Sequence, residues 1–128
     1  MACENDNDNV NVVKYLHEKI GLAKEDFQSS NNSACKLACQ YGCINVVEYL
    51  HKEVELTKED FQSSNNCACK LACANGHLNV VEYLHKEVGL TMHDFRSNYN
   101  EAYWSAYKRN NFDIVKYLNE EVGVRCWD

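Results

Sequence analysis

One motif returns along this chain at a fixed spacing of 34 residues, and this repeat constrains the fold more than any other feature. The motif joins two β-branched residues to a Tyr-Leu pair, and its four copies keep register without insertion or deletion: Val12–Leu16, Val46–Leu50, Val80–Leu84 and Ile114–Leu118. Residues 24–54 and 58–88 are identical at all but five of their 31 positions. A period of this length is typical of solenoids, in which short repeats stack in a row.

Each repeat combines two short helices, a tight turn and a polar loop. In the second repeat, small apolar residues predict a helix over residues 33–41, Gly42 ends it, and an apolar stripe predicts a longer helix over residues 45–54. Helices of about 8 to 11 residues do not persist alone in water, so neighbouring pairs must stabilise one another. We therefore expect one buried row of equivalent leucines, formed by Leu16, Leu50, Leu84 and Leu118.

The loops each carry one large apolar residue. Phe27 and its equivalents Phe61 and Phe95 stand in otherwise polar segments, and we expect them to hold the loops against the helix pairs. Thr57 is followed three positions later by Asp60, a spacing that predicts one capped helical turn inside the loop.

The first and second repeats depart from the common pattern. Residues 1–9 are rich in Asn and Asp and lack the apolar positions of an opening helix, so that helix is expected to be frayed or absent. Glu55 occupies the position that glycine holds in the other repeats, which predicts a strained residue or another helix stop there. The sequence thus predicts one all-α domain of about four repeats, at approximately residues 1–27, 28–61, 62–95 and 96–128.

Charge and hydropathy narrow the classes of partner. The formal net charge is -6, whereas nucleic-acid-binding domains usually carry a basic face, so we expect no nucleic-acid partner. No run of 18 or more apolar residues exists, and the first residues are polar and acidic where a secretory signal would be basic and then apolar. We expect an intracellular, cytoplasmic protein that does not insert into membranes.

The eight cysteines are expected to be free, structural thiols. A reducing compartment disfavours disulfides, and small buried thiols explain the helix positions Cys35, Cys39, Cys69 and Cys73. The alternative is a zinc- or redox-responsive domain that also uses Cys43, Cys67 or His77. It lacks the close Cys-x-x-Cys pairs usual in zinc sites. We therefore expect no metal and no cofactor.

The histidines do not form a catalytic set. His17, His51 and His85 are one repeated position, which we interpret as a surface position of the architecture. Nothing marks an oxyanion site or a third residue that would orient a Cys43–His77 pair, so we expect no enzymatic activity.

Residues 68–84 read Ala-Cys-Lys-Leu-Ala-Cys-Ala-Asn-Gly-His-Leu-Asn-Val-Val-Glu-Tyr-Leu. The small-residue first helix, the Gly-His turn and the Val-Val-x-x-Leu second helix resemble the ankyrin repeat. The loop pattern Glu-Asp-Phe-x-Ser-x-x-Asn is similar to that of ankyrin arrays of protists and large DNA viruses. The chain departs from the family in having no proline and a period one residue longer, with the extra residue expected near Val54, Val88 and Val122. A tetratricopeptide array is the alternative fold, but its Trp, Leu-Gly, Tyr and Pro markers are absent.

The resemblance implies a non-enzymatic module that binds a protein partner on its concave face and acts as a monomer. By register with positions of that family that commonly contact partners, the expected binding residues lie on the loop tips and the first helices: Ser30, Asn32, Gln40, Tyr41, Ser64, Asn66, Asn75, Asn98, Asn100, Trp104, Lys108 and Arg109.

The last repeat is rich in aromatic residues, which suit either a cap on the stack or a binding hot spot. We expect Tyr103 and Tyr107 to be buried, and Tyr99, Trp104 and Arg109 to point outward.

Overall fold

A computed structural model describes residues 5–125, and this part of the chain contains helices and no strand. Three helices end in a π-helical turn, namely η1 (Leu16–Ile20), η2 (Leu84–Val88) and η3 (Leu118–Val122). The α-helices are α1 (Asp6–Tyr15), α2 (Lys24–Phe27), α3 (Ser29–Tyr41), α4 (Ile44–Lys52), α5 (Lys58–Phe61), α6 (Ser63–Ala74), α7 (Leu78–Tyr83), α8 (Met92–Phe95), α9 (Ser97–Lys108) and α10 (Phe112–Tyr117). Within residues 5–125, no helix combines the length and the apolar composition needed to span a bilayer.

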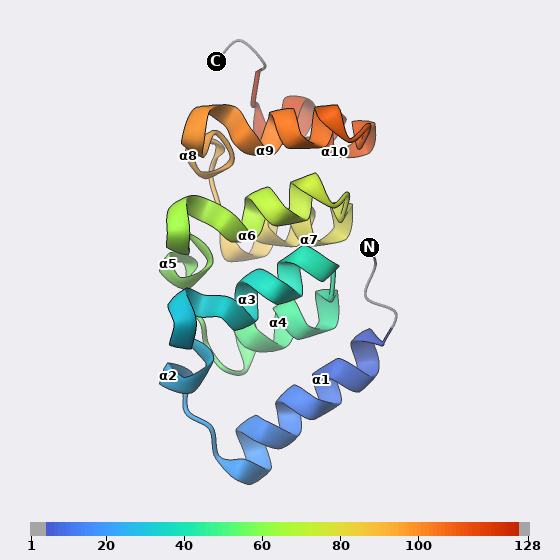
Figure 1. The fold of residues 1–128 in the computed structure, drawn as a ribbon. Helices are drawn as coiled ribbons and strands as arrows, with labels where there is room; N and C mark the ends of the chain where they lie inside the picture. Colours follow the sequence, from blue (N-terminus) through green and yellow to red (C-terminus); the bar gives the residue numbers. More distant parts are fainter. Residues whose placement is uncertain (1–4, 126–128) are drawn as a thin grey trace.

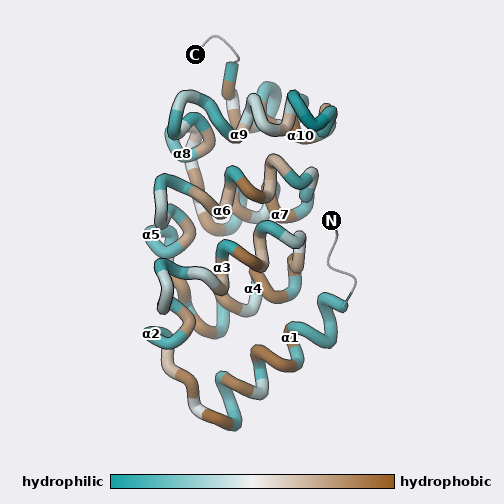
Figure 2. The backbone as a smooth tube through the Cα atoms, viewed as in Figure 1, coloured by the Kyte–Doolittle hydropathy of each residue, from teal (hydrophilic) through white to brown (hydrophobic). Residues whose placement is uncertain are grey.

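The helices stack in rows that follow the sequence period. The first helices α3, α6 and α9 pack on one another, and the second helices α1, α4, α7 and α10 form a row behind them (Figure 1). The short turns α2, α5 and α8 line one side of the stack (Figure 1). Hydrophobic residues recur in each layer (Figure 2). The all-helical prediction is confirmed, and the packing repeats at the spacing of the sequence motif.

The expected row of leucines is buried in three of its four positions. Leu50, Leu84 and Leu118 are buried, whereas Leu16 is only half-buried. The prediction is wrong at Leu16 because no first helix precedes α1 within the described residues. Among residues 5–9 no separate opening helix precedes α1, in agreement with the expectation of a frayed or absent one, and residues 6–9 form the first turn of α1 itself. The expectation for residues 1–4 lies outside the described residues.

The three repeated histidines are not surface positions, contrary to the interpretation from sequence. The Nδ1 atom of His51 lies 2.7 Å from the hydroxyl of Tyr83, and the pairs His17–Tyr49 and His85–Tyr117 repeat this bond at 2.9 and 2.8 Å. Each histidine is half-buried and also meets the loop phenylalanine of its own repeat edge to face. The side chain therefore joins its own loop to the second helix of the next repeat.

The phenylalanines Phe27, Phe61 and Phe95 are buried, so their predicted role as loop anchors is confirmed. The capped turn predicted within the loop is α5, in which Asp60 Oδ2 accepts hydrogen bonds from the backbone N–H of Thr57 and from its hydroxyl, at 2.7 and 3.1 Å.

Gln28, which follows the preceding turn α2, also donates to Asp60, to Oδ1 at 2.9 Å, and Gln62 after α5 donates to Asp94 in the same way at 2.8 Å. Burial alone would raise the pKa of Asp60, yet these hydrogen bonds hold it below its usual value. Each buried carboxylate thus caps one turn and couples it to the residue that follows the preceding turn.

Each first helix is entered through three consecutive residues in the left-handed conformation. Ser30, Asn31 and Asn32 have φ of 56°, 57° and 62°, and residues 64–66 and 98–100 repeat the geometry. Asn tolerates this region better than most residues because its short polar side chain bonds locally. Glu55 also has a positive φ, of 67°, which confirms the strained residue predicted at the position where other repeats hold glycine.

Candidate functional site

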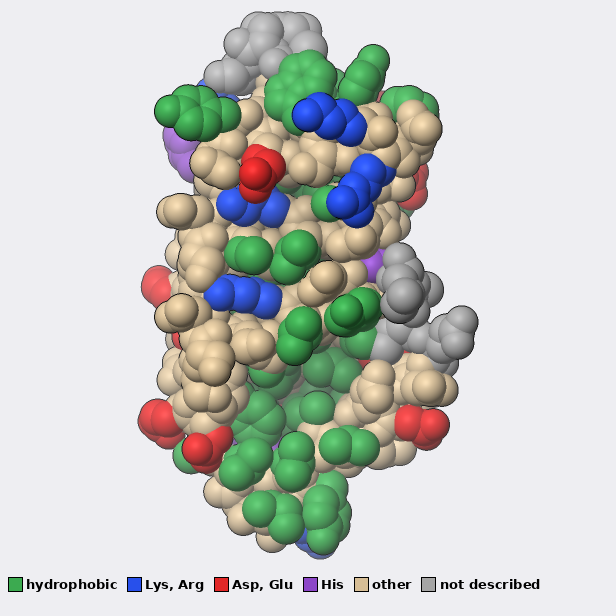
Figure 3. All heavy atoms as spheres, viewed as in Figure 1, with side chains coloured by type: hydrophobic (Ala, Val, Ile, Leu, Met, Phe, Trp, Pro, Cys, Tyr) green, Lys and Arg blue, Asp and Glu red, His purple; other side chains and the backbone are tan. Residues whose placement is uncertain are grey.

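The predicted binding residues fall mainly on one surface, which is formed by α3, α6 and α9 with their left-handed turns. We call it the first-helix surface. Figure 3 looks onto it and shows basic side chains along the stack and hydrophobic side chains gathered over α9. Equivalent residues from successive repeats form rows, and the row at the helix ends consists of Tyr41, Asn75 and Arg109.

Polar contacts connect neighbouring repeats across this surface. Arg109 donates from a guanidinium nitrogen to Asn75 Oδ1 at 3.3 Å, which brings two predicted residues together. The Lys36 ammonium donates to Ser64 Oγ at 2.7 Å, and Lys70 pairs with Glu101 at 3.2 Å. The surface is therefore a connected polar layer with side chains held in place from repeat to repeat.

Lys36 and Lys70 are part of this surface, but the sequence prediction did not include them. They are spaced by 34 residues from each other and from Trp104, which the prediction did include. The repeat period alone could have found them.

Three predicted binding residues are buried and so lie off the surface. Asn32, Asn66 and Asn100 are the last residues of the left-handed turns, and their side chains point into the molecule. The Nδ2 atom of Asn100 donates to the carbonyl oxygen of Arg125 at 3.0 Å. Because the left-handed backbone turns these amides inward, they hold the loops in place and are removed from the proposed contact set.

The remaining predicted residues are exposed or half-buried. Ser30, Asn98 and Lys108 are exposed, and Gln40 is half-buried. The backbone carbonyl oxygen of Gln40 lies 2.9 Å from His77 Nε2, so that part of the residue belongs to the repeat interface.

The aromatic residues of α9 differ from the expectation at one position. Tyr103 is buried and Tyr99 and Trp104 are exposed, as expected, but Tyr107 is 49 % exposed. Tyr107 stacks on Tyr103 at a centroid distance of 6.5 Å and meets Phe112 edge to face at 5.8 Å. It is exposed because no further helix packs on α9 within the described residues.

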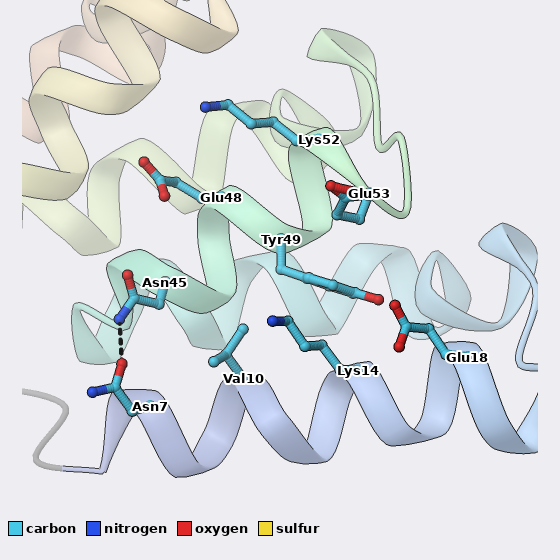
Figure 4. A pocket seen from close by; sticks show the side chains of 9 residues that line it. All are labelled: Asn7, Val10, Lys14, Glu18, Asn45, Glu48, Tyr49, Lys52 and Glu53. Atoms are coloured by element: carbon cyan, nitrogen blue, oxygen red, sulfur yellow. Dashed lines mark hydrogen bonds between the residues drawn. The ribbon is translucent and has the colours of Figure 1, made fainter.

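A hollow lies on the second-helix side of the stack, between α1 and α4. It encloses about 490 Å³, and Figure 4 shows Tyr49 reaching across it beside Lys14 and Glu18. The Lys14 ammonium lies 6.0 Å from the centre of the Tyr49 ring, and Asn45 Nδ2 donates to Asn7 Oδ1 at 2.8 Å. Charges of both signs occur along its lining, as is usual for a solvated helix face.

The thiols of the first helices are core residues. Cys35, Cys39, Cys69 and Cys73 are buried and free. Burial raises the pKa of Cys35 and of Cys73 to about 12 each. Within residues 5–125, no group of three or more His, Cys, Asp or Glu side chains could hold a metal ion. Packing explains these four positions.

Cys43 corrects the expectation that all thiols are free, since it is disulfide-bonded. It sits directly before α4, where sequence reasoning had considered it as a nucleophile with His77. A sulfur held in a disulfide is not a nucleophilic thiolate.

The reactivity of the thiols tests their structural role. With a thiol-specific reagent at pH 8, Cys67 is expected to react fastest among the free cysteines of the described chain, because it alone is not fully buried. Cys35, Cys39, Cys69 and Cys73 are expected to react only as the protein unfolds. Peptide mapping after a time course measures this order. Rapid labelling of one of the four in the folded protein would contradict it.

No protein-family model, no curated protein and no solved structure matches this chain. The interpretation of its surfaces therefore depends on the residues and contacts described above.

Proposed function

We propose that this chain is a non-enzymatic protein-binding module built as an ankyrin-like array, with its partner on the concave, first-helix surface. The repeated helix pairs and the left-handed stop at Gly42 support the fold assignment. The π-helical turns η2 and η3 end at Val88 and Val122. These are the positions near which the repeat is expected to hold one residue more than an ordinary ankyrin repeat. A π turn accommodates such an insertion.

The observation that carries the proposal is that exposed residues at one repeat position differ while the contacts that hold the repeats together stay the same. Tyr41, Asn75 and Arg109 hold the same position at the ends of α3, α6 and α9, yet they differ completely in chemistry. The contacts at the opposite, loop ends of these helices, such as the pairs Gln28–Asp60 and Gln62–Asp94, recur unchanged. A constant scaffold with variable exposed side chains is what recognition by a repeat protein requires.

The chemistry of this surface favours a protein partner. Tyr, Trp and Arg side chains dominate the binding energy of protein interfaces, and Tyr41, Trp104 and Arg109 are exposed here. A net charge of -6 disfavours the phosphate backbone of a nucleic acid. We also propose that the protein acts as an intracellular, cytoplasmic monomer.

Simultaneous replacement of Tyr41, Trp104 and Arg109 by alanine is expected to abolish partner binding without unfolding the protein. The partner is first captured by crosslinking from a lysate of the source organism, and its affinity for the purified wild-type chain is then measured by titration. The triple variant is expected to lose about 2 kcal/mol or more of binding free energy, as at protein hot spots. Its circular dichroism spectrum is expected to match the wild type, since all three residues are exposed.

The double variant Glu48→Ala and Glu82→Ala is the matched control, because these residues lie on the second helices α4 and α7. It is expected to bind as the wild type does. If the control lost the partner while the triple variant kept it, the second-helix side would be the binding surface and the proposal would be wrong.

A further inference from the structure

A groove of about 710 Å³ lies between α1 and α3, at the N-terminal end of the stack. Val12, Val13 and Leu16 of α1 form one wall, and Ala34 and Leu37 belong to the opposite wall on α3. Figure 3 shows hydrophobic side chains in the hollow at the lower end of the molecule. Apolar surface of this kind is open to a partner.

The next repeat shows what covers the equivalent surface. Ala68 of α6 holds the position of Ala34, and it is 1 % exposed because α3 packs against it. Leu71 is half-buried, whereas its equivalent Leu37 is 49 % exposed. The groove is therefore an acceptor surface for a first helix, and within residues 5–125 no first helix occupies it.

The groove also contains polar acceptors whose equivalents in the covered repeat are hydrogen-bonded. In the covered repeat, Lys36 donates to Ser64 Oγ at 2.7 Å and Gln28 donates to the Asp60 carboxylate at 2.9 Å. The equivalents of these two acceptors are Ser30 and Asp26, and both line the groove. Asp26 accepts from the backbone N–H of Ala23, and no lysine or glutamine of the described chain donates to either residue.

We propose that this groove docks a short α-helix of a partner protein whose contact face copies that of α3. In α3, the small buried residues Cys35 and Cys39 allow this helix to pack closely on α6. The partner helix would need equally small side chains at the two equivalent positions to pack closely on α3. A lysine placed like Lys36 would reach Ser30, and a glutamine placed like Gln28 would reach Asp26. The groove adjoins the first-helix surface, because Ser30 and Tyr41 line the groove and also belong to the contact set predicted for that surface.

The direct test is a titration of the full chain with a fluorescein-labelled peptide that has the sequence of residues 24–42. Saturable binding is expected. Leu37→Glu is expected to weaken it about tenfold or more, because a carboxylate would be buried against the apolar wall. Tyr107→Glu, which changes an equally exposed side chain at the other end of the stack, is expected to leave the affinity unchanged.

A short peptide pays the cost of forming its helix, so a linked version is the second measurement. A copy of residues 24–39 replaces residues 1–5, which continues the 34-residue register. The extended chain is expected to unfold at higher denaturant concentration than the wild type, and Leu37→Glu is expected to cancel the gain.

Absence of both peptide binding and added stability would overturn the proposal, as would a peptide that binds the Leu37→Glu variant equally well. Sedimentation of the wild-type chain tests one other occupant. Self-association that Leu37→Glu abolishes would assign the groove to a second copy of this chain and would likewise overturn it.

Discussion

Replacing Leu84 with alanine is expected to lower the free energy of unfolding by about 2 to 5 kcal/mol, the range observed when a large side chain is removed from a packed core. Leu84 is fully buried at the centre of the stack and lies between its equivalents Leu50 and Leu118. Its loss would leave a cavity within the buried row of leucines. Denaturant unfolding followed by circular dichroism measures the change.

Leu16→Ala is the matched control, since it removes the same atoms from the same repeat position where the side chain is only half-buried. Its expected cost is about 1 kcal/mol, because less apolar surface returns to water. Equal costs for the two variants would mean that α1 is packed as fully as the inner repeats, which would contradict the open groove.

Replacing Asp94 with alanine is expected to cost about 3 kcal/mol, because it leaves several partly buried donors without their charged acceptor. The carboxylate accepts from the backbone N–H of Thr91 at 2.8 Å, from its hydroxyl at 3.2 Å and from Gln62 at 2.8 Å. Asp26→Ala is the control. That carboxylate is exposed and, among residues 5–125, accepts only from the backbone N–H of Ala23, so a cost below about 1 kcal/mol is expected.

The pH dependence of stability provides an independent test of the role of Asp94. Burial alone would raise the pKa of this carboxyl, but the hydrogen bonds from Thr91, Gln62 and Asn66 lower it below its ordinary value of 3.8. A lowered pKa means that the stabilisation is complete above the ordinary value and is lost as the pH falls below it. The difference in stability between wild type and Asp94→Ala is therefore expected to shrink between roughly pH 5 and pH 2. A difference that stayed constant over this range would contradict an ionised Asp94.

The helices and their periodic packing could be predicted because both depend on local pattern. The spacing of apolar residues fixes which face of a short helix is buried, and the 34-residue period transfers that assignment to every repeat. Phe61 and Asp60 were also predictable, since an isolated apolar residue and a capping spacing are signals within a few positions of the chain.

Contacts between repeats could not be predicted in the same way. A polar residue such as His51 is expected from sequence to be exposed. It contacts Tyr83 only because two neighbouring repeats stack, which brings its Nδ1 atom within 2.7 Å of the Tyr83 hydroxyl. The prediction that Asn66 lies on the binding surface was wrong for a related reason. An Asn in a loop is usually exposed, but a left-handed backbone with φ of 61° turns its side chain inward.

The candidate surface was predicted in outline. Tyr41, Trp104 and Arg109 are exposed as expected, because their positions at or near the ends of first helices follow from the period. The lysines missed between them belong to the same period. The sequence prediction did not include these lysines, and the contacts of Lys36 with Ser64 and of Lys70 with Glu101 are between repeats, where a local pattern gives no signal.

The His–Tyr bonds also determine how the length of this molecule can change over generations. Each bond joins residues 32 positions apart, and the same His–Tyr pair recurs at three junctions between repeats. A gene that loses or duplicates one whole unit encodes a chain in which each histidine again meets a tyrosine. A deletion of any other size breaks every bond across the junction. Recombination is thus free to shorten or lengthen the array in whole units while the rest of the protein keeps its contacts.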